Sequence, residues 1–336
     1  MKKILITGNL GYIGTSLTDV LIKKYKIVGC DIGYFRKCII TKNFKKKNFK
    51  QINKDINEIN LNDLKNVNTI IHLAALSNDP LGEMNKKLTY EVNYKSTIKL
   101  AKLAKSSGVK RFIYISTQSL YGISSSKKVL NESEKKNPIT AYAKTKLLAE
   151  NIIKDLIDDN FKILIFRPAT VFGPSARFRS DIILNNLVGS AVTTGKINIL
   201  SDGKPWRPIL HITDICKVIE KSINIKITKK INGEAFNVGV KNGNYTVSQL
   251  AKIVKNNIKN TKIIYSKNPP KDERTYKVNF NKLYKVFGKN IITPNKINLQ
   301  IKQLATFLKK NNFMLKDFTS AKTNRILQLK KIFNAI

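Results

Sequence analysis

An α/β fold is predicted for this chain of 336 residues, with a doubly wound parallel sheet and a smaller mixed α/β lobe beside it. In the first half, short apolar runs alternate with helical patterns of roughly 10 to 18 residues, the rhythm of right-handed β–α–β crossovers. One apolar run, at residues 68–74, lacks polar alternation until its end, as expected of a strand buried on both faces. Past Arg167 the rhythm becomes irregular and is punctuated by prolines and glycines, which indicates the second lobe.

The individual elements follow from these patterns in chain order. Strands are expected at residues 3–7, 26–30, 68–74, 111–116 and 161–167, and helices at 14–24, 90–107 and 141–156. Further along we expect helices at 181–193, 214–223, 247–258, 297–310 and 324–333, and strands at 234–238 and 262–265. The sheet domain is assigned to residues 1–170 with a returning segment near 206–222, and the smaller lobe over its carboxyl edge to 171–205 and 223–336.

The charge of the chain is strongly positive, with 62 Lys+Arg against 22 Asp+Glu and a formal net charge of +40. Such an excess first suggests a nucleic acid or an anionic membrane as partner. Only eight of these residues are arginines, however, and the lysines are spread along the whole chain. Nucleic-acid binders concentrate basic residues on one element and use arginine for bidentate contacts. We therefore expect a solvated coat of lysines and no nucleic-acid partner.

Several classes of protein are excluded by what the sequence contains. No stretch approaches the ~18 to 20 apolar residues of a membrane span, and Gly8 and Gly11 end the first apolar run too early for a signal peptide. The three cysteines lack CxxC or metal-ligand spacing, and the two histidines, His72 and His211, are too few for a multi-histidine metal site. These observations predict a reduced, cytoplasmic protein with no metal and no membrane partner.

A glycine-rich turn, Gly8-x-x-Gly11-x-x-Gly14, lies between the first expected strand and the first helix. Gly8 suits a tight turn, Gly11 lets a pyrophosphate approach the backbone, and Gly14 lets the helix pack close to the strand. Asp31 ends the second strand, where an acid can bind the ribose hydroxyls of an adenosine. The pattern predicts a Rossmann sheet that binds NAD. Arg36 and Lys37 lie close by and leave NADP as the alternative.

Two further segments can flank the same cofactor. Asp55 and Ile56 follow a lysine-rich stretch and can lie beside the adenine, although a solvated loop aspartate is an equal alternative. Leu73, Ala74 and Ala75 end a strand with small residues, which would let the backbone run beside the dinucleotide.

Tyr142 and Lys146 lie four residues apart on one face of the expected helix at 141–156. A phenol titrates near ~10, so it becomes a base at neutral pH only if a positive charge stabilises its phenolate. Lys146, one turn away, and the nicotinamide ring would both do so. The pair alone arises easily by chance in a lysine-rich chain, but Thr117 at the end of the strand 111–116 can hydrogen-bond a reacting sugar oxygen.

In this order, the glycine turn, Asp31, Thr117 and the Tyr142–Lys146 pair resemble the extended short-chain dehydrogenase/reductase family, in particular its NAD-dependent nucleotide-sugar epimerases and dehydratases. The resemblance continues through residues 119–122, 167–174 and 206–211. It implies the catalytic residues Thr117, Tyr142 and Lys146. The expected cofactor-binding residues are Gly8, Leu10, Gly11, Tyr12, Ile13, Gly14, Asp31, Asp55, Ile56, Leu73, Ala74, Ala75, Asn93, Ser116, Tyr142, Lys146 and Pro168.

The subclass is indicated by the two positions after Thr117. Dehydratases of this family carry an Asp–Glu pair there, whereas this chain has Gln118 and Ser119, neither of which is an acid or base at neutral pH. The resemblance therefore implies an NAD-dependent nucleotide-sugar epimerase, acting at C4 through a keto-sugar. A 4-keto-reductase, or a non-catalytic dinucleotide-binding sensor or RNA-binding relative, are the alternatives. Thr170 stands where epimerases often carry an Asn, which leaves the reacting carbon open.

Five of the eight arginines fall between residues 167 and 274, and arginine suits diphosphate recognition. By resemblance, Arg207 and Arg274 would meet the nucleotide diphosphate; Arg177 and Arg179 are expected on a loop at the pocket mouth, and Arg167 is as easily structural. His211 is expected to cap or pack near Arg207. The implied partners are a nucleotide-diphosphate sugar and a second copy of the chain, paired through the helices at 90–107 and 141–156. The expected substrate-binding residues are Ser77, Thr117, Gln118, Thr170, Arg179, Asn185, Arg207 and Arg274.

Overall fold

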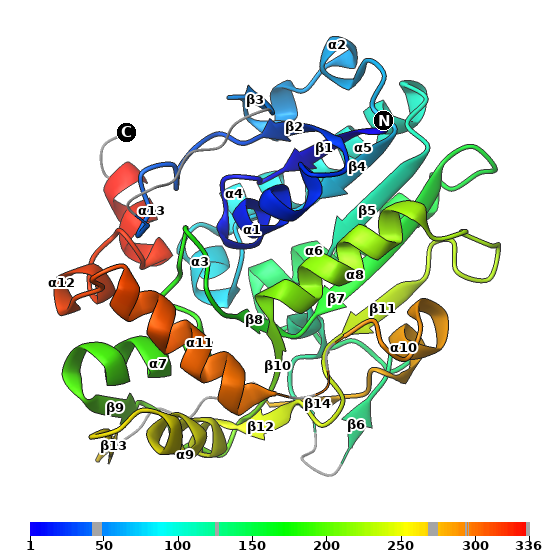
Figure 1. Ribbon diagram of the computed structural model, residues 1–336. Coiled ribbons are helices and arrows are strands. Elements are labelled where there is room, and N and C mark those ends of the chain that lie inside the picture. The colour runs from blue at the N-terminus through cyan, green and yellow to red at the C-terminus, as the bar shows by residue number, and fades with distance from the viewer. Residues whose placement is uncertain (42–48, 125–127, 268–274, 293, 295, 334–336) are drawn as a thin grey trace.

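The computed structural model describes residues 1–41, 49–124, 128–267, 275–292, 294 and 296–333. Its centre is a sheet of seven parallel strands in the order β11-β7-β5-β4-β1-β2-β3 (Figure 1). The sequence direction reverses between β1 and β4, so the doubly wound α/β sheet predicted from the sequence is confirmed. The strands are β1 (Lys3–Thr7), β2 (Lys26–Cys30), β3 (Lys50–Ile52), β4 (Thr69–His72), β5 (Arg111–Ile115), β7 (Lys162–Pro168) and β11 (Ala235–Val238).

Helices cover both faces of this sheet, which is why its central strands are largely apolar and almost entirely buried. On one face α1 (Tyr12–Leu21) packs beside α8 (Ile212–Asn224), and their buried side chains join Ile4, Ile6 and Ile71 in one core. On the other face α5 (Ser96–Ser106) and α6 (Ala141–Lys154) bury Leu100 and Ile153 against Leu5 and Ile70. α8 belongs to the segment expected to return near 206–222, and the assignment of that whole segment to the sheet domain remains a prediction, since β10 (Trp206–His211) at its start pairs with β8 (Thr170–Phe172) and β12 (Asn244–Thr246).

The region between β4 and β5 differs from its prediction. The helix expected over 90–107 is present as a π-helical turn (Glu91–Lys95) followed by α5, but the helical stretch begins earlier, with α4 (Lys86–Tyr90), and a separate helix, α3 (Asp79–Met84), precedes it. Asn78 and Asn85 cause the extra starts, because each side chain accepts a hydrogen bond from the backbone of the helix that follows it. Short turns also occur at Ile56–Glu58, at α2 (Leu61–Leu64) and at Gln118–Tyr121.

The second lobe lies toward the carboxyl ends of the strands (Figure 1). Its core is formed by α7 (Ile183–Thr194), α9 (Val247–Asn257) and α11 (Ile297–Lys310), which bury Leu187, Leu250 and Leu304 together. Small sheets complete it: β8 (Thr170–Phe172), β10 (Trp206–His211) and β12 (Asn244–Thr246); β9 (Lys196–Ile199) with β13 (Lys262–Tyr265); and β6 (Val129–Leu130) with β14 (Lys277–Val278). The domain boundary at residue 170 remains a prediction.

The last helices of the chain lie at different places on this frame. α10 (Asn281–Phe287) packs on β11, α12 (Leu315–Phe318) packs on α7, and α13 (Arg325–Phe333) reaches back to α3. Leu329 of α13 is fully buried with Leu76 and Leu81, so the end of the chain borders the carboxyl edge of the sheet (Figure 1).

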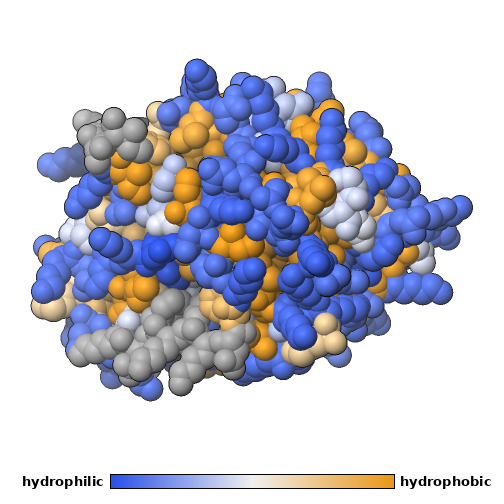
Figure 2. Space-filling model, turned by 90° about the horizontal axis from the view of Figure 1, so that it is seen from above, coloured by the Kyte–Doolittle hydropathy of each residue, from blue (hydrophilic) through white to orange (hydrophobic). Residues whose placement is uncertain are grey.

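The surface agrees with the charge pattern. Figure 2 shows one face of the molecule, where hydrophilic residues cover most of the area and apolar residues form scattered patches between them. Within the described ranges, no helix is long and apolar enough to cross a membrane.

Candidate active site

A cavity of about 430 Å³ lies along the carboxyl ends of β1, β2, β4, β5 and β7. This is the edge where open α/β sheets bind ligands, at the point where the strand order reverses. At one end the cavity is lined by the glycine turn and Asp31, and at the other by Thr117, Tyr142 and Arg207. The structure therefore brings the predicted cofactor residues and the predicted catalytic residues to one site.

The glycine turn has the geometry that a dinucleotide needs. Gly8 has φ +71° and donates its N–H to Cys30 O at 2.8 Å, which ties the end of β1 to the end of β2. A Cβ on Gly8 would lie 2.7 Å from Ala74 N, and one on Gly14 would lie 2.2 Å from Gly8 O. Both contacts are shorter than real atoms allow. The tight turn and the close packing of α1 against it therefore depend on these glycines.

Asp31 forms the wall of the cavity nearest β2. Its carboxylate accepts hydrogen bonds from Leu10 N at 3.0 Å and from Gly33 N at 2.7 Å, and burial raises its pKa from the ordinary value. Leu10 does not line the cavity; its backbone N–H helps to hold the Asp31 carboxylate. Asp55 lines the same end and also caps the turn at 56–58, where it accepts from Asn57 N at 2.8 Å.

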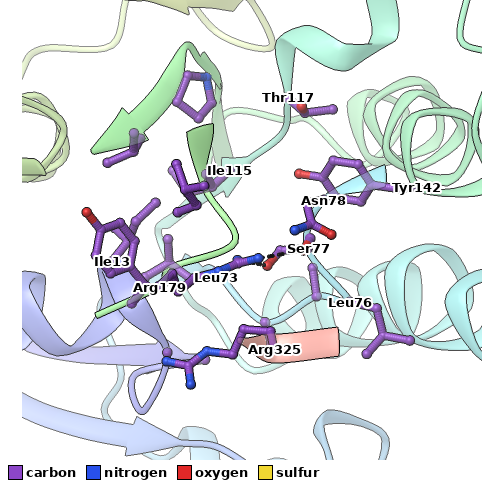
Figure 3. Close-up of a pocket in the computed structure, with 18 of the residues that line it drawn as sticks. Ile13, Leu73, Leu76, Ser77, Asn78, Ile115, Thr117, Tyr142, Arg179 and Arg325 are labelled. Atoms are coloured by element: carbon purple, nitrogen blue, oxygen red, sulfur yellow. Dashed lines mark hydrogen bonds between the residues drawn. The ribbon is translucent and has the colours of Figure 1, made fainter. Parts of the chain in front are cut away.

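Tyr142 and Thr117 lie side by side at the other end of the cavity (Figure 3). Both side chains line the cavity, and Tyr142 is 8% exposed. Burial raises the pKa of Tyr142 above its ordinary value, while the Thr117 hydroxyl and the Arg179 charge act to lower it. Thr117 also accepts from Ser119 N at 3.0 Å, which fixes its side chain at the start of the turn after β5.

Lys146 lies one helical turn along α6 from Tyr142, but its ammonium group has other partners. Nζ donates to Ile115 O at 2.7 Å and lies 4.6 Å from the centre of the Tyr114 ring. Burial lowers the pKa of Lys146 to about 7. In the protein by itself, the groups that lower the pKa of Tyr142 most are Thr117 and Arg179, and the expected effect of Lys146 together with the nicotinamide ring remains a prediction.

Arg179 is the most firmly held charge in the cavity. Its guanidinium group donates to both carboxylate oxygens of Asp181, at 3.0 and 2.7 Å, and to Ser77 Oγ at 2.9 Å. Figure 3 shows the side chain reaching across to Ser77. Arg207 and Thr170 line the cavity from the second lobe, and Arg207 donates to Trp206 O at 2.9 Å. Arg274 lies outside the described residues.

Several predicted positions take other roles. Arg177 is not at the pocket mouth as expected: it is 2% exposed and donates to Thr15 Oγ1 at 3.1 Å beneath the glycine turn. Asn185 does not line the cavity; its amide donates to the Tyr12 hydroxyl and its oxygen accepts from Gly173 N. Asn93 likewise lies behind the lining and bonds both the N–H and the carbonyl of Leu76. The physical reason is the same for all three residues: each side chain forms hydrogen bonds with buried backbone or side-chain partners.

The structure shows the contacts of two residues, Arg167 and His211, for which the sequence left more than one role open. Arg167 is structural: with 3% of its side chain exposed, it forms a two-pronged ion pair with the fully buried Glu150. His211 accepts or donates one hydrogen bond with Thr213 Oγ1 at 2.8 Å and packs edge-on against Phe172. Burial lowers the pKa of His211 to about 4, so its ring is neutral at neutral pH.

The cavity also contains residues that the sequence reasoning missed. The remaining predicted positions, which are Gly11, Tyr12, Ile13, Ile56, Leu73, Ala75, Ser116, Gln118 and Pro168, all line it. The additional polar or aromatic lining residues are Tyr34, Phe35, Asn78, Asp79, Ser119, Asp181, Tyr276 and Arg325. The signal for Asp79 was its position just past the strand end at β4, where parallel strands present functional side chains.

Among the described residues, no group of three or more His, Cys, Asp or Glu could hold a metal ion.

Comparison with known proteins identifies the family. The profile of the NAD-dependent epimerase/dehydratase family matches residues 4–239. The chain is 30% identical over 274 residues to a dTDP-D-glucose 4,6-dehydratase of Mus musculus, across 77% of this chain and 74% of that protein.

Solved structures of low identity share the fold. A UDP-glucose 4-epimerase from Thermotoga maritima, with UDP-glucose, superposes with a TM-score of 0.78 at 21% identity, over 92% of this chain and 99% of that one. A UDP-glucuronic acid 4-epimerase from Bacillus cereus, in complex with UDP-glucuronic acid and NAD, has a TM-score of 0.75 at 24% identity, with the same coverage.

The residues present fit the cofactor of this family, which is NAD. Gly8 and Gly14 permit the tight turn and the close packing of α1 on it, Gly11 lines the cavity where a pyrophosphate would approach, and Asp31 presents a carboxylate at the end of β2. With the profile match over residues 4–239 and the relative at 30% identity, these features establish that the chain belongs to the NAD-dependent epimerase/dehydratase family.

Proposed function

We propose that this enzyme is a nucleotide-sugar epimerase that inverts C4 by transient oxidation to a keto-sugar. The observation that carries the proposal is the placement of Tyr142 and Thr117 side by side at the cavity wall, with the buried Lys146 one helical turn from Tyr142 (Figure 3). The two positions that follow Thr117 are Gln118 and Ser119, which supply no acid for elimination of water. Structures of similar fold include 4-epimerases of UDP-sugars, which supports C4 as the reacting carbon.

Tyr142 is the proposed base that takes the proton from the sugar hydroxyl. NAD, when bound, would supply a hydride acceptor and, in its oxidised form, a positive charge that favours the phenolate. Thr117 holds the same sugar oxygen through its hydroxyl, and this hydroxyl also acts to lower the pKa of Tyr142. After the sugar turns in the cavity, Tyr142 returns the proton to the C4 oxygen.

Lys146 acts as a positioning residue in this scheme. Its bond to Ile115 O ties α6 to the end of β5, so Tyr142 on the helix and Thr117 after the strand keep their relative places. Its pKa of about 7 means that the ammonium form is only partly populated at neutral pH in the protein by itself. A negative charge that develops on Tyr142 would favour that form.

The proposed substrate carries a nucleotide diphosphate, because Arg179 and Arg207 both line the cavity. These two arginines come from different segments and can donate to oxygens of the same diphosphate.

We also propose a homodimer formed through α5 and α6. The exposed Leu148, 41% exposed, gives α6 an apolar outward position for such a contact, and sedimentation of wild type against Leu148→Lys tests it.

The experiment is incubation with UDP-glucose, UDP-glucuronic acid, UDP-N-acetylglucosamine and dTDP-glucose without added reductant. We expect one of them to be converted to its 4-epimer. Tyr142→Phe should keep NAD binding and lose turnover by roughly 10²- to 10⁴-fold. Tyr265→Phe, an exposed tyrosine of β13 outside the cavity, is the matched control and should behave as wild type. Undiminished turnover in Tyr142→Phe would remove Tyr142 as the base.

A 4-keto-reductase is the alternative reaction. It would consume NADH stoichiometrically with a 4-keto-sugar and would form no epimer. Net oxidation of NADH together with no epimer in the panel would replace the epimerase proposal by this one.

A further inference from the structure

The cavity contains a carboxylate next to the proposed base that neither hydride transfer nor diphosphate binding uses. Asp79 is the first residue of α3 and lines the cavity together with Thr117, Ser119 and Tyr142. It comes from the segment after β4, far in sequence from the catalytic positions on β5 and α6.

Packing fixes this carboxylate beside Tyr142. α3 lies directly against α6, because a Cβ on Gly82 would be only 2.7 Å from Tyr142 Cβ. One turn before Gly82, Asp79 is near enough to Tyr142 for its charge to raise the pKa of that phenol. The backbone before it is strained, since Asn78 has φ +93°, a region that side chains other than glycine rarely adopt. Strain of this kind is found where structure holds a functional group in place.

Two hydroxyls hold the Asp79 carboxylate. Oδ1 accepts from Thr140 Oγ1 at 2.5 Å, and Oδ2 accepts from Ser119 Oγ at 3.3 Å. Ser119 is one of the two positions at which the resemblance implied that dehydratases carry their acids. The sequence reasoning found no acid there, but the fold brings one to it from another element.

We propose that Asp79 is a general acid–base that removes and returns a proton at the carbon next to the transient C4 ketone. The inference rests on the proposed function, because the ketone must form first. In this step the C–H bond at C3 or C5 breaks, the proton goes to the Asp79 carboxylate, and the electron pair moves through the new C=C bond onto the C4 oxygen. Tyr142 and Thr117 face that oxygen with their hydroxyls and stabilise the enolate. Return of the proton restores the ketone, so no further oxidant or reductant is needed.

This step gives the site chemistry beyond simple inversion at C4. A proton returned to the opposite face inverts the neighbouring carbon, and loss of a leaving group from the enolate is elimination. Each of these reactions exchanges the proton with solvent water, whereas C4 inversion by hydride transfer alone does not.

The test uses the whole protein with NAD and the four nucleotide sugars named above, in D₂O. Bound NADH absorbance and 4-epimer formation report the oxidation, and mass spectrometry of the recovered sugar reports deuterium on carbon. With wild type we expect deuterium in the sugar that forms NADH. In Asp79→Asn we expect deuterium incorporation to fall by about 100-fold or more, while NADH formation falls by less than about tenfold.

Glu83→Gln is the matched control. Glu83 is the other carboxylate of α3 and, like Asp79, it holds the start of α6, accepting from Ala141 N at 2.6 Å, but it does not line the cavity. If Asp79 served only to position α6, the two variants would lose NADH formation and deuterium exchange in parallel. We expect exchange to persist in Glu83→Gln, and a parallel loss in both variants would overturn the proposal.

The outcomes separate the two proposals. NADH and epimer formation without deuterium in wild type would overturn the role of Asp79 and leave the epimerase intact. Deuterium incorporation that survives in Asp79→Asn would also overturn that role. Absence of NADH, epimer and deuterium with every sugar would overturn both proposals.

Discussion

Glu150→Gln is expected to be among the most destabilising single substitutions near the site. Glu150 is fully buried on α6, and Arg167 on β7 donates to its two oxygens at 3.0 and 2.6 Å. The amide keeps the shape of the side chain but removes its charge, so the Arg167 guanidinium is left buried without a counter-ion. Breaking a buried pair in this way costs about 3 to 5 kcal/mol of unfolding free energy. For a chain of 336 residues this corresponds to a drop in Tm of roughly 4 to 7 °C.

The measurement is urea unfolding, followed by circular dichroism and by fluorescence of Trp206, the single tryptophan. Glu91→Gln is the matched control, because Glu91 pairs with Lys95 at 2.8 Å but both side chains are solvent-exposed, at 39% and 57%. Exposed pairs contribute about 0.2 to 1 kcal/mol. The double variant Glu150→Leu with Arg167→Met should recover most of the lost stability, because it removes both buried charges. A cost for Glu150→Gln below about 1 kcal/mol would refute the assignment of a buried, mutually dependent pair.

Two further substitutions test the cofactor end and the buried lysine. Gly14→Ala should weaken NAD binding, measured by calorimetry, because its Cβ would lie 2.2 Å from Gly8 O and must displace the turn. For Lys146, the folded pKa of about 7 lies below the unfolded value, so the folded state binds fewer protons and wild-type unfolding free energy rises with pH between the two values. Lys146→Met should lack this rise. The unfolding free energy of wild type minus that of the variant should therefore increase by about 2 kcal/mol from pH 7 to 9. No change in that difference would contradict the low pKa of Lys146.

The parts of the site that the sequence predicted are those fixed by local geometry. Gly8 and Gly14 belong to one strand–turn–helix unit, so their spacing alone specifies the turn. Tyr142 and Lys146 are one helical turn apart, and helix periodicity alone puts them on one face.

The direction of a side chain depends on partners that are distant in sequence. Lys146 turns to Ile115 O and the Tyr114 ring, a choice that its own helix does not determine. Arg177 and Arg179 are two residues apart, yet one lies beneath the glycine turn and the other faces the cavity.

Asp79 was missed for a related reason. α3 is only six residues long, too short for a helical period to be recognised, and it starts after a strained residue, Asn78. Its place beside Tyr142 arises from contact between α3 and α6, which are about 60 residues apart in the chain. The acid near Ser119 is therefore part of a three-dimensional cluster, which the residues that follow Thr117 in the sequence do not reveal.

The +40 charge and the buried charges obey different physical constraints. Among the described residues Lys146 is the one buried lysine, and burial lowers its pKa to about 7, so its charge depends on its surroundings. Buried arginines keep theirs: Arg325, 1% exposed, still has a pKa of about 10. A surface cation can therefore change from arginine to lysine at little cost, whereas a buried one that must stay charged cannot. In a chain that otherwise uses lysine, Arg179, a buried arginine among those that line the cavity, therefore fits a position where a permanent positive charge is used.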